Sequence, residues 1–238
     1  MKRRALLIGN SKGLGGVKKD IVNFKAFLMG IHGGAWNFGE IEMLMNPSKS
    51  LLLDRINRIK AEENDFVITM FSGHGGYQRT TILEINGDGE VIEESKLWSL
   101  APKQISIFDC CRTVCDYTEE REILNEVKTF SRDDEKTLAR HIYENRIGSA
   151  AVQQNKLYAC SIGQCAYDNG EEGAYYLKNL IRSAKTITGS YGLVGDVHDV
   201  AAQRTHTEVM FWENAIQDPV ANLPKLLSSQ QLILSVSI

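Results

Sequence analysis

Short apolar runs alternate with longer amphipathic segments along most of this chain, and that alternation narrows the choice of fold. The amphipathic segments repeat apolar residues every three or four positions, which is typical of helices that cover a sheet. Short apolar runs bounded by polar or glycine residues are typical of buried strands. Together they predict an α/β fold, a three-layer αβα sandwich around a mostly parallel sheet of about six strands. The predicted strands are 5–8, 41–44, 66–71, 105–108, 157–160 and 232–236, and the clearest helices are 17–29, 48–62 and 172–184.

Size and composition favour one folded domain. A chain of 238 residues can bury one substantial core, and its 43% hydrophobic and 24% charged residues are ordinary for a globular protein. The stretch 116–155 differs, because charged residues there replace the regular apolar pattern. We therefore expect a single domain, 1–238, in which a larger part (1–115) and a smaller part (156–238) are joined by a helical but exposed connector, 116–155.

Charge and cysteine content restrict the partners and the compartment. The 27 basic and 30 acidic residues are mixed along the chain, so no nucleic-acid partner is predicted. The apolar run at 5–8 is too short for a signal peptide or a membrane span, so no membrane partner is predicted either. Five cysteines are an odd number in a chain without an export signal, which favours reduced thiols and a cytoplasmic protein.

Two predicted strands end in residues that can carry out chemistry. His74 follows the strand 66–71 between glycines, and Asp109, Cys110 and Cys111 follow the strand 105–108. In parallel sheets the carboxyl ends of strands form one edge, where ligands bind. A cysteine paired with a histidine is the minimum equipment for acyl transfer through a thioester, because imidazole takes the thiol proton and returns it to the leaving group.

Two structural alternatives compete with this catalytic interpretation. His74 could simply stabilise a loop while Cys110 and Cys111 are buried as small apolar side chains. A zinc site would use His74, Cys110, Cys111 and Cys115, but their spacing lacks the usual pairs of C-x-x-C ligands. The position of both groups at strand ends favours the catalytic interpretation.

These motifs resemble those of the metacaspases. The segment 72–75, Ser-Gly-His-Gly, is similar to their histidine motif, and 109–111, Asp-Cys-Cys, is similar to their aspartate-x-cysteine motif, whose third residue is the nucleophile. The caspase signature is matched only at Cys111 and Arg112. The resemblance extends from residue 5 to about residue 178. It implies a caspase-like fold and a cysteine endopeptidase with Cys111 as nucleophile and His74 as general base.

The resemblance also implies a substrate pocket. In metacaspases the residues matching Asp20, Ser72 and Asp109 line the pocket for the residue before the scissile bond, so arginine or lysine is expected there through charge pairing. The backbone N–H groups of Gly75 and Cys111 would bind the oxyanion. The implied partners are a peptide or protein substrate and an activating partner protein.

The sequence departs from the metacaspase pattern in two places. The segment after His74 lacks the acidic insertion with which type I metacaspases bind calcium, and Asp88 and Glu90 are more simply turn residues. No metal and no cofactor are therefore predicted, and activation by calcium is in doubt. Ile162 and Gly163 replace the paired acids that precede a glutamine in the family, which weakens the predicted selectivity of the pocket.

Glycines also mark a loop at 9–16 and the turn of a hairpin at 81–92. The loop 9–16 follows a strand and precedes a helix, but it fits neither nucleotide-binding fingerprint, so we expect it to border the substrate cleft. The stretches 81–85 and 90–92 predict a hairpin near the site, with Asn86-Gly87 supplying the positive φ angles of its turn.

The same motifs are compatible with two other functions. The chief alternative is a non-catalytic caspase-like module that binds a partner in a signalling or defence assembly. A thiol hydrolase acting on a small amide is a third possibility, since Cys–His chemistry does not specify a polypeptide. For a peptidase that prefers basic residues, the connector would offer self-cleavage positions at Lys128, Arg132, Lys136, Arg140 and Arg146.

Overall fold

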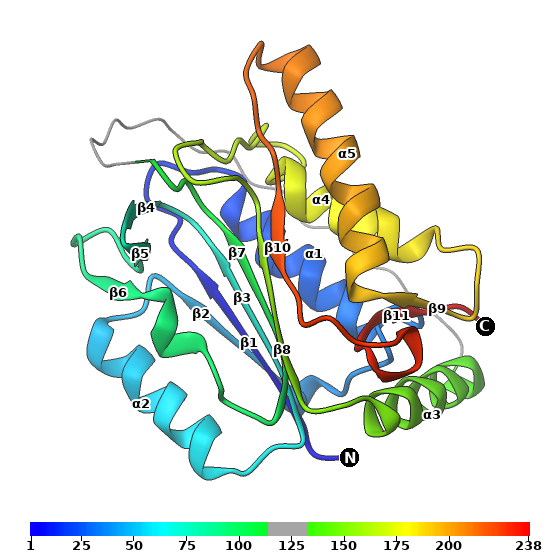
Figure 1. The fold of residues 1–238 in the computed structure, drawn as a ribbon. Helices are drawn as coiled ribbons and strands as arrows, with labels where there is room; N and C mark the ends of the chain where they lie inside the picture. Colours follow the sequence, from blue (N-terminus) through cyan, green and yellow to red (C-terminus); the bar gives the residue numbers. More distant parts are fainter. Residues whose placement is uncertain (114–132) are drawn as a thin grey trace.

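The computed structural model, which describes residues 1–113 and 133–238, has a six-stranded sheet at its centre (Figure 1). The strand order is β10-β8-β7-β3-β1-β2, and each neighbouring pair is parallel except β10 and β8. This confirms the predicted α/β sandwich with a mostly parallel sheet. The strands are β1 (Arg3–Gly9), β2 (Ile41–Met45), β3 (Phe66–Ser72), β7 (Lys103–Asp109), β8 (Gln153–Tyr158) and β10 (Val220–Asn222).

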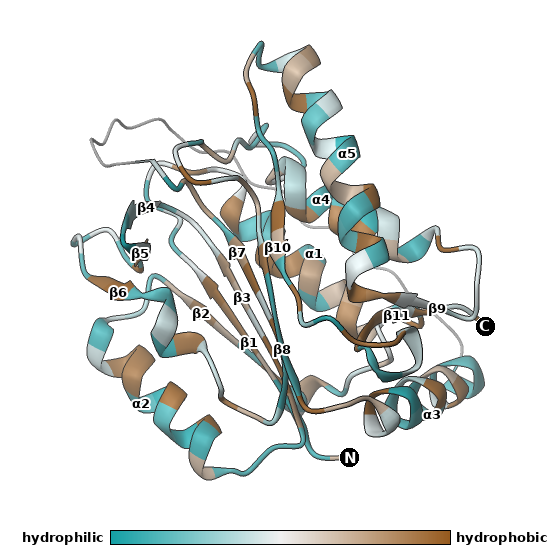
Figure 2. Ribbon diagram, in the orientation of Figure 1, coloured by the Kyte–Doolittle hydropathy of each residue, from teal (hydrophilic) through white to brown (hydrophobic). Residues whose placement is uncertain are grey.

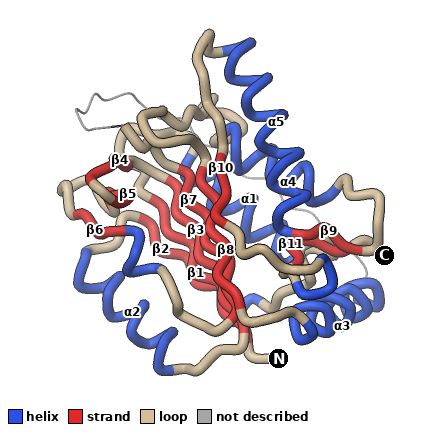
Figure 3. Tube along the Cα trace, in the orientation of Figure 1, coloured by secondary structure: helices blue, strands red, loops and turns tan. Residues whose placement is uncertain are grey.

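Helices cover both faces of this sheet (Figures 1 and 3). Alternate side chains of each central strand enter two separate cores: Leu7 and Ile68 pack with α1, α3, α4 and α5, whereas Leu6 and Val67 pack with α2. Figure 2 shows the hydrophobic positions gathered on the central strands β1, β3 and β7. The helices are α1 (Val17–Met29), α2 (Lys49–Ala61), α3 (Asp133–Ser149), α4 (Tyr175–Lys185) and α5 (Val194–Trp212). Within the described ranges, no helix is both long and apolar enough to cross a bilayer.

Part of the C-terminal region differs from the prediction. The last strand, β11 (Ile233–Val236), forms a separate sheet with β9 (Tyr191–Leu193), and the sixth strand of the main sheet is β10. β10 has three residues and is largely exposed, so it carries no buried alternation to reveal it. The helix α5 was also not predicted, since polar residues such as His198 and Thr205 interrupt its buried face.

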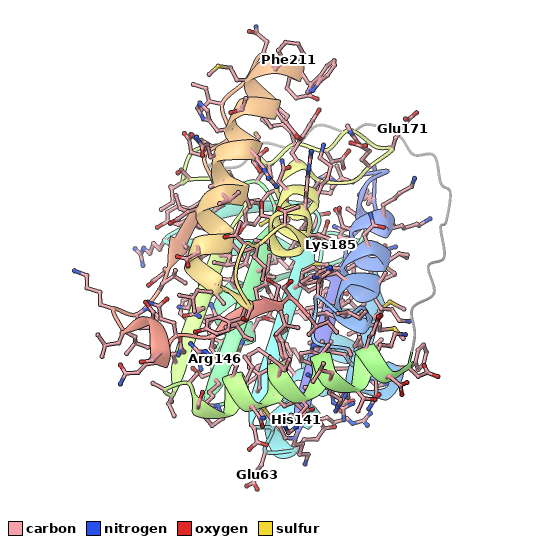
Figure 4. All side chains as sticks on the ribbon, turned by 90° about the vertical axis from the view of Figure 1, so that its right-hand side faces the viewer. Glu63, His141, Arg146, Glu171, Lys185 and Phe211 are labelled. Atoms are coloured by element: carbon pink, nitrogen blue, oxygen red, sulfur yellow. The ribbon has the colours of Figure 1, made fainter. Side chains whose placement is uncertain are left out.

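The connector is not exposed throughout. Its first part, 116–132, lies outside the described residues, and α3 fills most of the remainder. Figure 4 shows α3 along its length, with His141 and Arg146 labelled. On its buried face, Tyr143 is fully enclosed and its ring lies 6.3 Å from that of Phe66. The prediction of an exposed connector is therefore wrong for one face of α3, and β8 begins at Gln153, within the predicted connector.

The positions suggested for self-cleavage are affected by this helix. Lys136, Arg140 and Arg146 all lie in α3, and Arg140 pairs with Glu40 and Glu144 at 2.5 and 2.9 Å. A peptidase needs an extended substrate, so cleavage at these three positions would require α3 to unwind. Lys128 and Arg132 lie outside the described residues.

The predicted hairpin is present, but the conformation of its turn differs from the predicted one. β5 (Thr80–Glu84) pairs antiparallel with β6 (Val91–Glu93), and an unpredicted strand, β4 (Gly75–Gln78), completes a three-stranded sheet. Positive φ occurs at Gly89 (76°) and not at Gly87. Asn86 instead shapes the turn through its side chain, whose Oδ1 accepts hydrogen bonds from the backbone N–H groups of Asp88 and Glu90.

Candidate active site

The register of β3 and β7 brings the two sequence motifs together. Ser72 is the pairing partner of Asp109, and the N–H of Gly73 donates to the carbonyl of Asp109 at 3.1 Å. Both strands therefore end at the same level, and the residues that follow share one edge. They line a cavity of about 60 Å³. Its lining is Leu14, Val17, Asp20, Ser72, Gly73, His74, Asp109, Cys110, Cys111, Ala166, Tyr167, Asp168 and Ala174.

A backbone carbonyl orients His74. The Nε2 of His74 lies 2.6 Å from the carbonyl oxygen of Lys12, which can only accept a hydrogen bond. In the neutral imidazole the proton is therefore on Nε2, and the lone pair of Nδ1 is available to a general base. No third residue could be named from sequence, because a backbone carbonyl leaves no signature there.

The glycine-rich loop 9–16 provides that carbonyl. The Nδ2 of Asn10 donates to the carbonyl of Glu84 at 2.9 Å, and the Nζ of Lys12 donates to that of Gly87 at 2.8 Å. The loop is thus fastened to the hairpin, while Leu14 lines the cavity. The expectation that this loop borders the cleft agrees with its position.

The two adjacent cysteines differ in environment. Cys110 is buried against the core, and burial raises the pKa of its thiol well above the ordinary value. Cys111 is half-buried and lines the cavity, where its Sγ lies 3.8 Å from the carbonyl oxygen of Ala166. The more accessible thiol therefore belongs to Cys111, which is also the residue that the metacaspase motif selects.

The thiols of Cys111 and Cys165 are in contact. A hydrogen bond from Cys111 lowers the pKa of Cys165 to about 6, and the same hydrogen bond, together with burial, raises the pKa of Cys111. Cys165 was not singled out from the sequence.

Arg112 fixes the chain just after Cys111. Its side chain is buried, donates to the Thr81 hydroxyl and to the Cys160 carbonyl, each at 3.2 Å, and stacks 4.1 Å from the centre of the Tyr158 ring. Arg112 thereby joins β5 and the end of β8 to the segment that carries Cys111.

Carboxyl groups form the floor of the cavity. Asp20 is buried, and its Oδ2 accepts from the Ser72 hydroxyl at 2.7 Å while its Oδ1 accepts from the N–H of Ala174 at 2.9 Å. Asp109 is also buried and accepts from the N–H of Leu177 at 3.1 Å. Burial raises the pKa of Asp20 to about 7 and that of Asp109 well above its ordinary value.

A third carboxyl group, Asp168, was missed. It is half-buried in the same lining, and its negative charge contributes to the raised pKa of both Asp20 and Asp109. Its Oδ1 accepts from the N–H of Gly170 at 2.9 Å. Asp168 lies in a loop beyond β8, where strand periodicity cannot show which way a side chain points.

The proposed oxyanion residue Gly75 lies at the start of β4, against Cys110. A Cβ atom added at Gly75 would lie 2.7 Å from the Cys110 Sγ, so the close packing of these segments requires glycine there.

Within residues 1–113 and 133–238, no group of three or more histidine, cysteine, aspartate or glutamate side chains is arranged to hold a metal ion.

Gly173 allows the loop 168–174 to close over Asp20. Its φ is +94°, and an added Cβ would collide with the Asp20 Oδ1. We expect Gly173→Ala to destabilise the protein by about 1–3 kcal/mol and to displace Asp20. Cleavage of a substrate that uses this pocket should fall by at least about tenfold, since small displacements in a site are costly.

Gly170→Ala is the matched control for this prediction. Gly170 also has a positive φ, +69°, but among the described residues none beyond its two neighbours in the chain lies within 4 Å of its added Cβ. It should show a similar loss of stability in thermal unfolding with little loss of kcat/KM. Equal losses of kcat/KM in the two variants would show that backbone strain, and not contact with Asp20, is responsible.

Comparisons with known proteins identify the family. A model of the caspase domain matches residues 2–214. The crystal structure of caspase-1 from Spodoptera frugiperda resembles this chain in fold, with a TM-score of 0.65 over 99% of this chain and 92% of that one, at 11% sequence identity. A search of curated protein sequences found no match. Because the matched range runs from β1 to the end of α5 and holds His74, Cys111 and the acidic cavity, this chain belongs to the caspase-domain family of cysteine peptidases.

Proposed function

We propose that this protein is a metacaspase-like cysteine endopeptidase that cleaves after arginine or lysine in cytoplasmic protein substrates. The observation that carries the proposal is one cavity lined by His74, Cys111 and three aspartates. Among the described residues, no lysine or arginine lines it. A cationic side chain is therefore the occupant that compensates its charge.

The chemistry follows from the two reacting side chains. The sulfur of Cys111 attacks the substrate carbonyl carbon as its proton passes to Nδ1 of His74, and the N–H groups of Gly75 and Cys111 stabilise the oxyanion. Nδ1 then gives that proton to the leaving amine as the peptide bond breaks. Water, deprotonated by His74, hydrolyses the thioester and restores the thiol. The Lys12 carbonyl stabilises the imidazolium through Nε2–H at 2.6 Å.

The acidic floor of the cavity, formed by Asp20 and Asp109, is expected to change its ionisation state when a substrate binds. Burial keeps Asp20 and Asp109 in an environment that favours the neutral form, so their charge is incomplete in the unliganded protein near pH 7. A guanidinium or ammonium group favours the carboxylate form of both acids. Binding of a basic side chain is thus expected to release protons, and half-buried Asp168 supplies charge at the mouth of the cavity.

The direct test is a set of fluorogenic peptides with Arg, Lys or Asp before the scissile bond, assayed with and without calcium. We expect cleavage after Arg or Lys, and equal rates with calcium or a chelator. Cleavage after Asp would contradict the role of the acidic floor. If no peptide is cleaved, addition of a cell extract separates a peptidase that needs an activating partner from a non-catalytic binding module.

A further inference from the structure

Backbone hydrogen bonds hold the loop after β8 beside the segment that follows β7. The N–H of Arg112 donates to the carbonyl of Gln164, and the N–H of Gly163 donates to the carbonyl of Arg112, each at 2.9 Å. The Cys160 thiol adds hydrogen bonds to the carbonyls of Cys110 and Gln164 at 3.4 and 3.3 Å. Two segments tied in this way run side by side.

This arrangement places Cys111 opposite Cys165. The hydrogen bond from the Arg112 N–H to the Gln164 carbonyl joins the two segments. Cys111 directly precedes Arg112, and Cys165 directly follows Gln164. The Cys111 Sγ also lies 3.8 Å from the carbonyl oxygen of Ala166. The residues on both sides of Cys165 are therefore held against Cys111 and Arg112, which brings the two cysteines together as a disulfide requires.

The pair also differs from the remaining described cysteines in reactivity. Cys111 and Cys165 are half-buried, and the lowered pKa of Cys165 favours the thiolate, the form that reacts with peroxides. Cys110 and Cys160 are buried, and burial raises the pKa of both. Oxidation should therefore begin at the Cys111–Cys165 pair.

We propose that Cys111 and Cys165 form a reversible disulfide when the protein meets hydrogen peroxide. The Cys165 thiolate attacks one peroxide oxygen, and the O–O bond breaks to give a sulfenic acid and hydroxide. The Cys111 sulfur then attacks the Cys165 sulfur, and the sulfenic oxygen leaves as water. In total, two thiols are oxidised and one peroxide is reduced to two molecules of water.

The disulfide has a clear consequence for the site. It removes the Cys111 sulfur as a nucleophile, and it protects that sulfur from sulfinic and sulfonic acids, which thiols do not reverse. A dithiol such as dithiothreitol restores both thiols by exchange. The disulfide depends on the two thiols alone, so it is expected to form whether or not the protein cleaves peptides.

Mass spectrometry of the full chain tests for the Cys111–Cys165 disulfide. The reduced protein is treated with one equivalent of hydrogen peroxide, alkylated and digested. We expect one linked pair of peptides, two hydrogen atoms lighter than their sum, joining Cys111 to Cys165 and released by dithiothreitol. A bond from Cys111 to Cys115, a bond between two chains, or oxidation of Cys111 to sulfinic acid without a disulfide would each overturn the proposal.

Two variants sharpen this test. Cys165→Ser, checked for folding by circular dichroism, should give no intramolecular disulfide and about tenfold more irreversibly oxidised Cys111. Cys115→Ser, which removes another thiol close to Cys111 in sequence, should behave like the wild type. Peptidase activity is measured in parallel, so a failed disulfide and a failed peptidase assignment give different results.

Discussion

Replacing Cys111 with alanine is expected to lower kcat/KM for arginine peptides by roughly 10³-fold to 10⁶-fold, since loss of a nucleophile removes the covalent pathway. The fold should survive, because Cys111 is half-buried and the neighbouring Arg112 keeps its contacts with Thr81 and Cys160. Steady-state hydrolysis of a fluorogenic peptide, together with a thermal unfolding curve, measures both effects.

Cys110→Ala is the matched control, because it removes the adjacent thiol. Cys110 is 2% exposed and packs in the core, so this variant should lose some stability but keep most of its activity. The reverse result, in which Cys110→Ala is inactive and Cys111→Ala is active, would move the nucleophile by one residue and contradict the motif assignment.

The second large effect is expected at Asp20. Asp20→Asn removes a buried carboxyl group that a bound cation would ionise, and we expect kcat/KM for arginine peptides to fall by about 30-fold to 10³-fold. The amide can keep both observed contacts, accepting from the Ala174 N–H and donating to the Ser72 hydroxyl. Geometry is therefore kept while the charge is lost.

The same substitution should stabilise the protein at high pH. Burial raises the pKa of Asp20 from about 4, the ordinary value, to about 7, so the folded state favours the neutral carboxyl group. The stability contributed by this preference is fully present below about pH 4 and is lost as the pH rises through 7. An asparagine side chain never ionises, so Asp20→Asn should exceed the wild type in free energy of unfolding by about 1–3 kcal/mol at pH 8.

Urea unfolding at pH 5 and pH 8 measures this difference. The gain from Asp20→Asn should be small at pH 5 and large at pH 8, and a gain that is the same at both values would rule out ionisation as its cause. Asp168→Asn is the matched control. Asp168 is half-buried, so its replacement should raise stability at pH 8 by less than Asp20→Asn does, through loss of its repulsion with ionised Asp20.

The sequence predicted those parts of the fold and site that depend on local pattern. The apolar runs located four of the parallel strands and only the last two residues of the fifth, β8, and the strand ends brought His74 and Cys111 to one edge. Asp20 is different: its spacing on α1 suggests a solvated carboxylate, and only the resemblance to metacaspases moved it into the pocket. The structure buries it between Ser72 and Ala174, two residues far apart in sequence.

Other parts could not be predicted because their causes are not local. The Lys12 carbonyl orients His74 as a consequence of loop path, and any residue type would supply the same atom. Asp168 and Cys165 reach the site through a loop whose position is set by hydrogen bonds to Arg112 and Gln217. These contacts join segments far apart in the sequence, which the pairing of β7 with β8 holds side by side.

The pairing of β7 with β8 has a consequence for how the chain could be divided. Their ladder runs from Lys103 opposite Gln153 to Phe108 opposite Tyr158, and the two strands are separated in sequence by residues 110–152. A cut between residues 114 and 132 would produce one fragment with His74, Cys111 and Asp20 and another with Cys165 and Asp168. Each alone would expose an unpaired strand edge, so the two would associate through it. Completion of the acidic cavity would then depend on fragment concentration, and the chain could serve as a split reporter whose signal follows complementation.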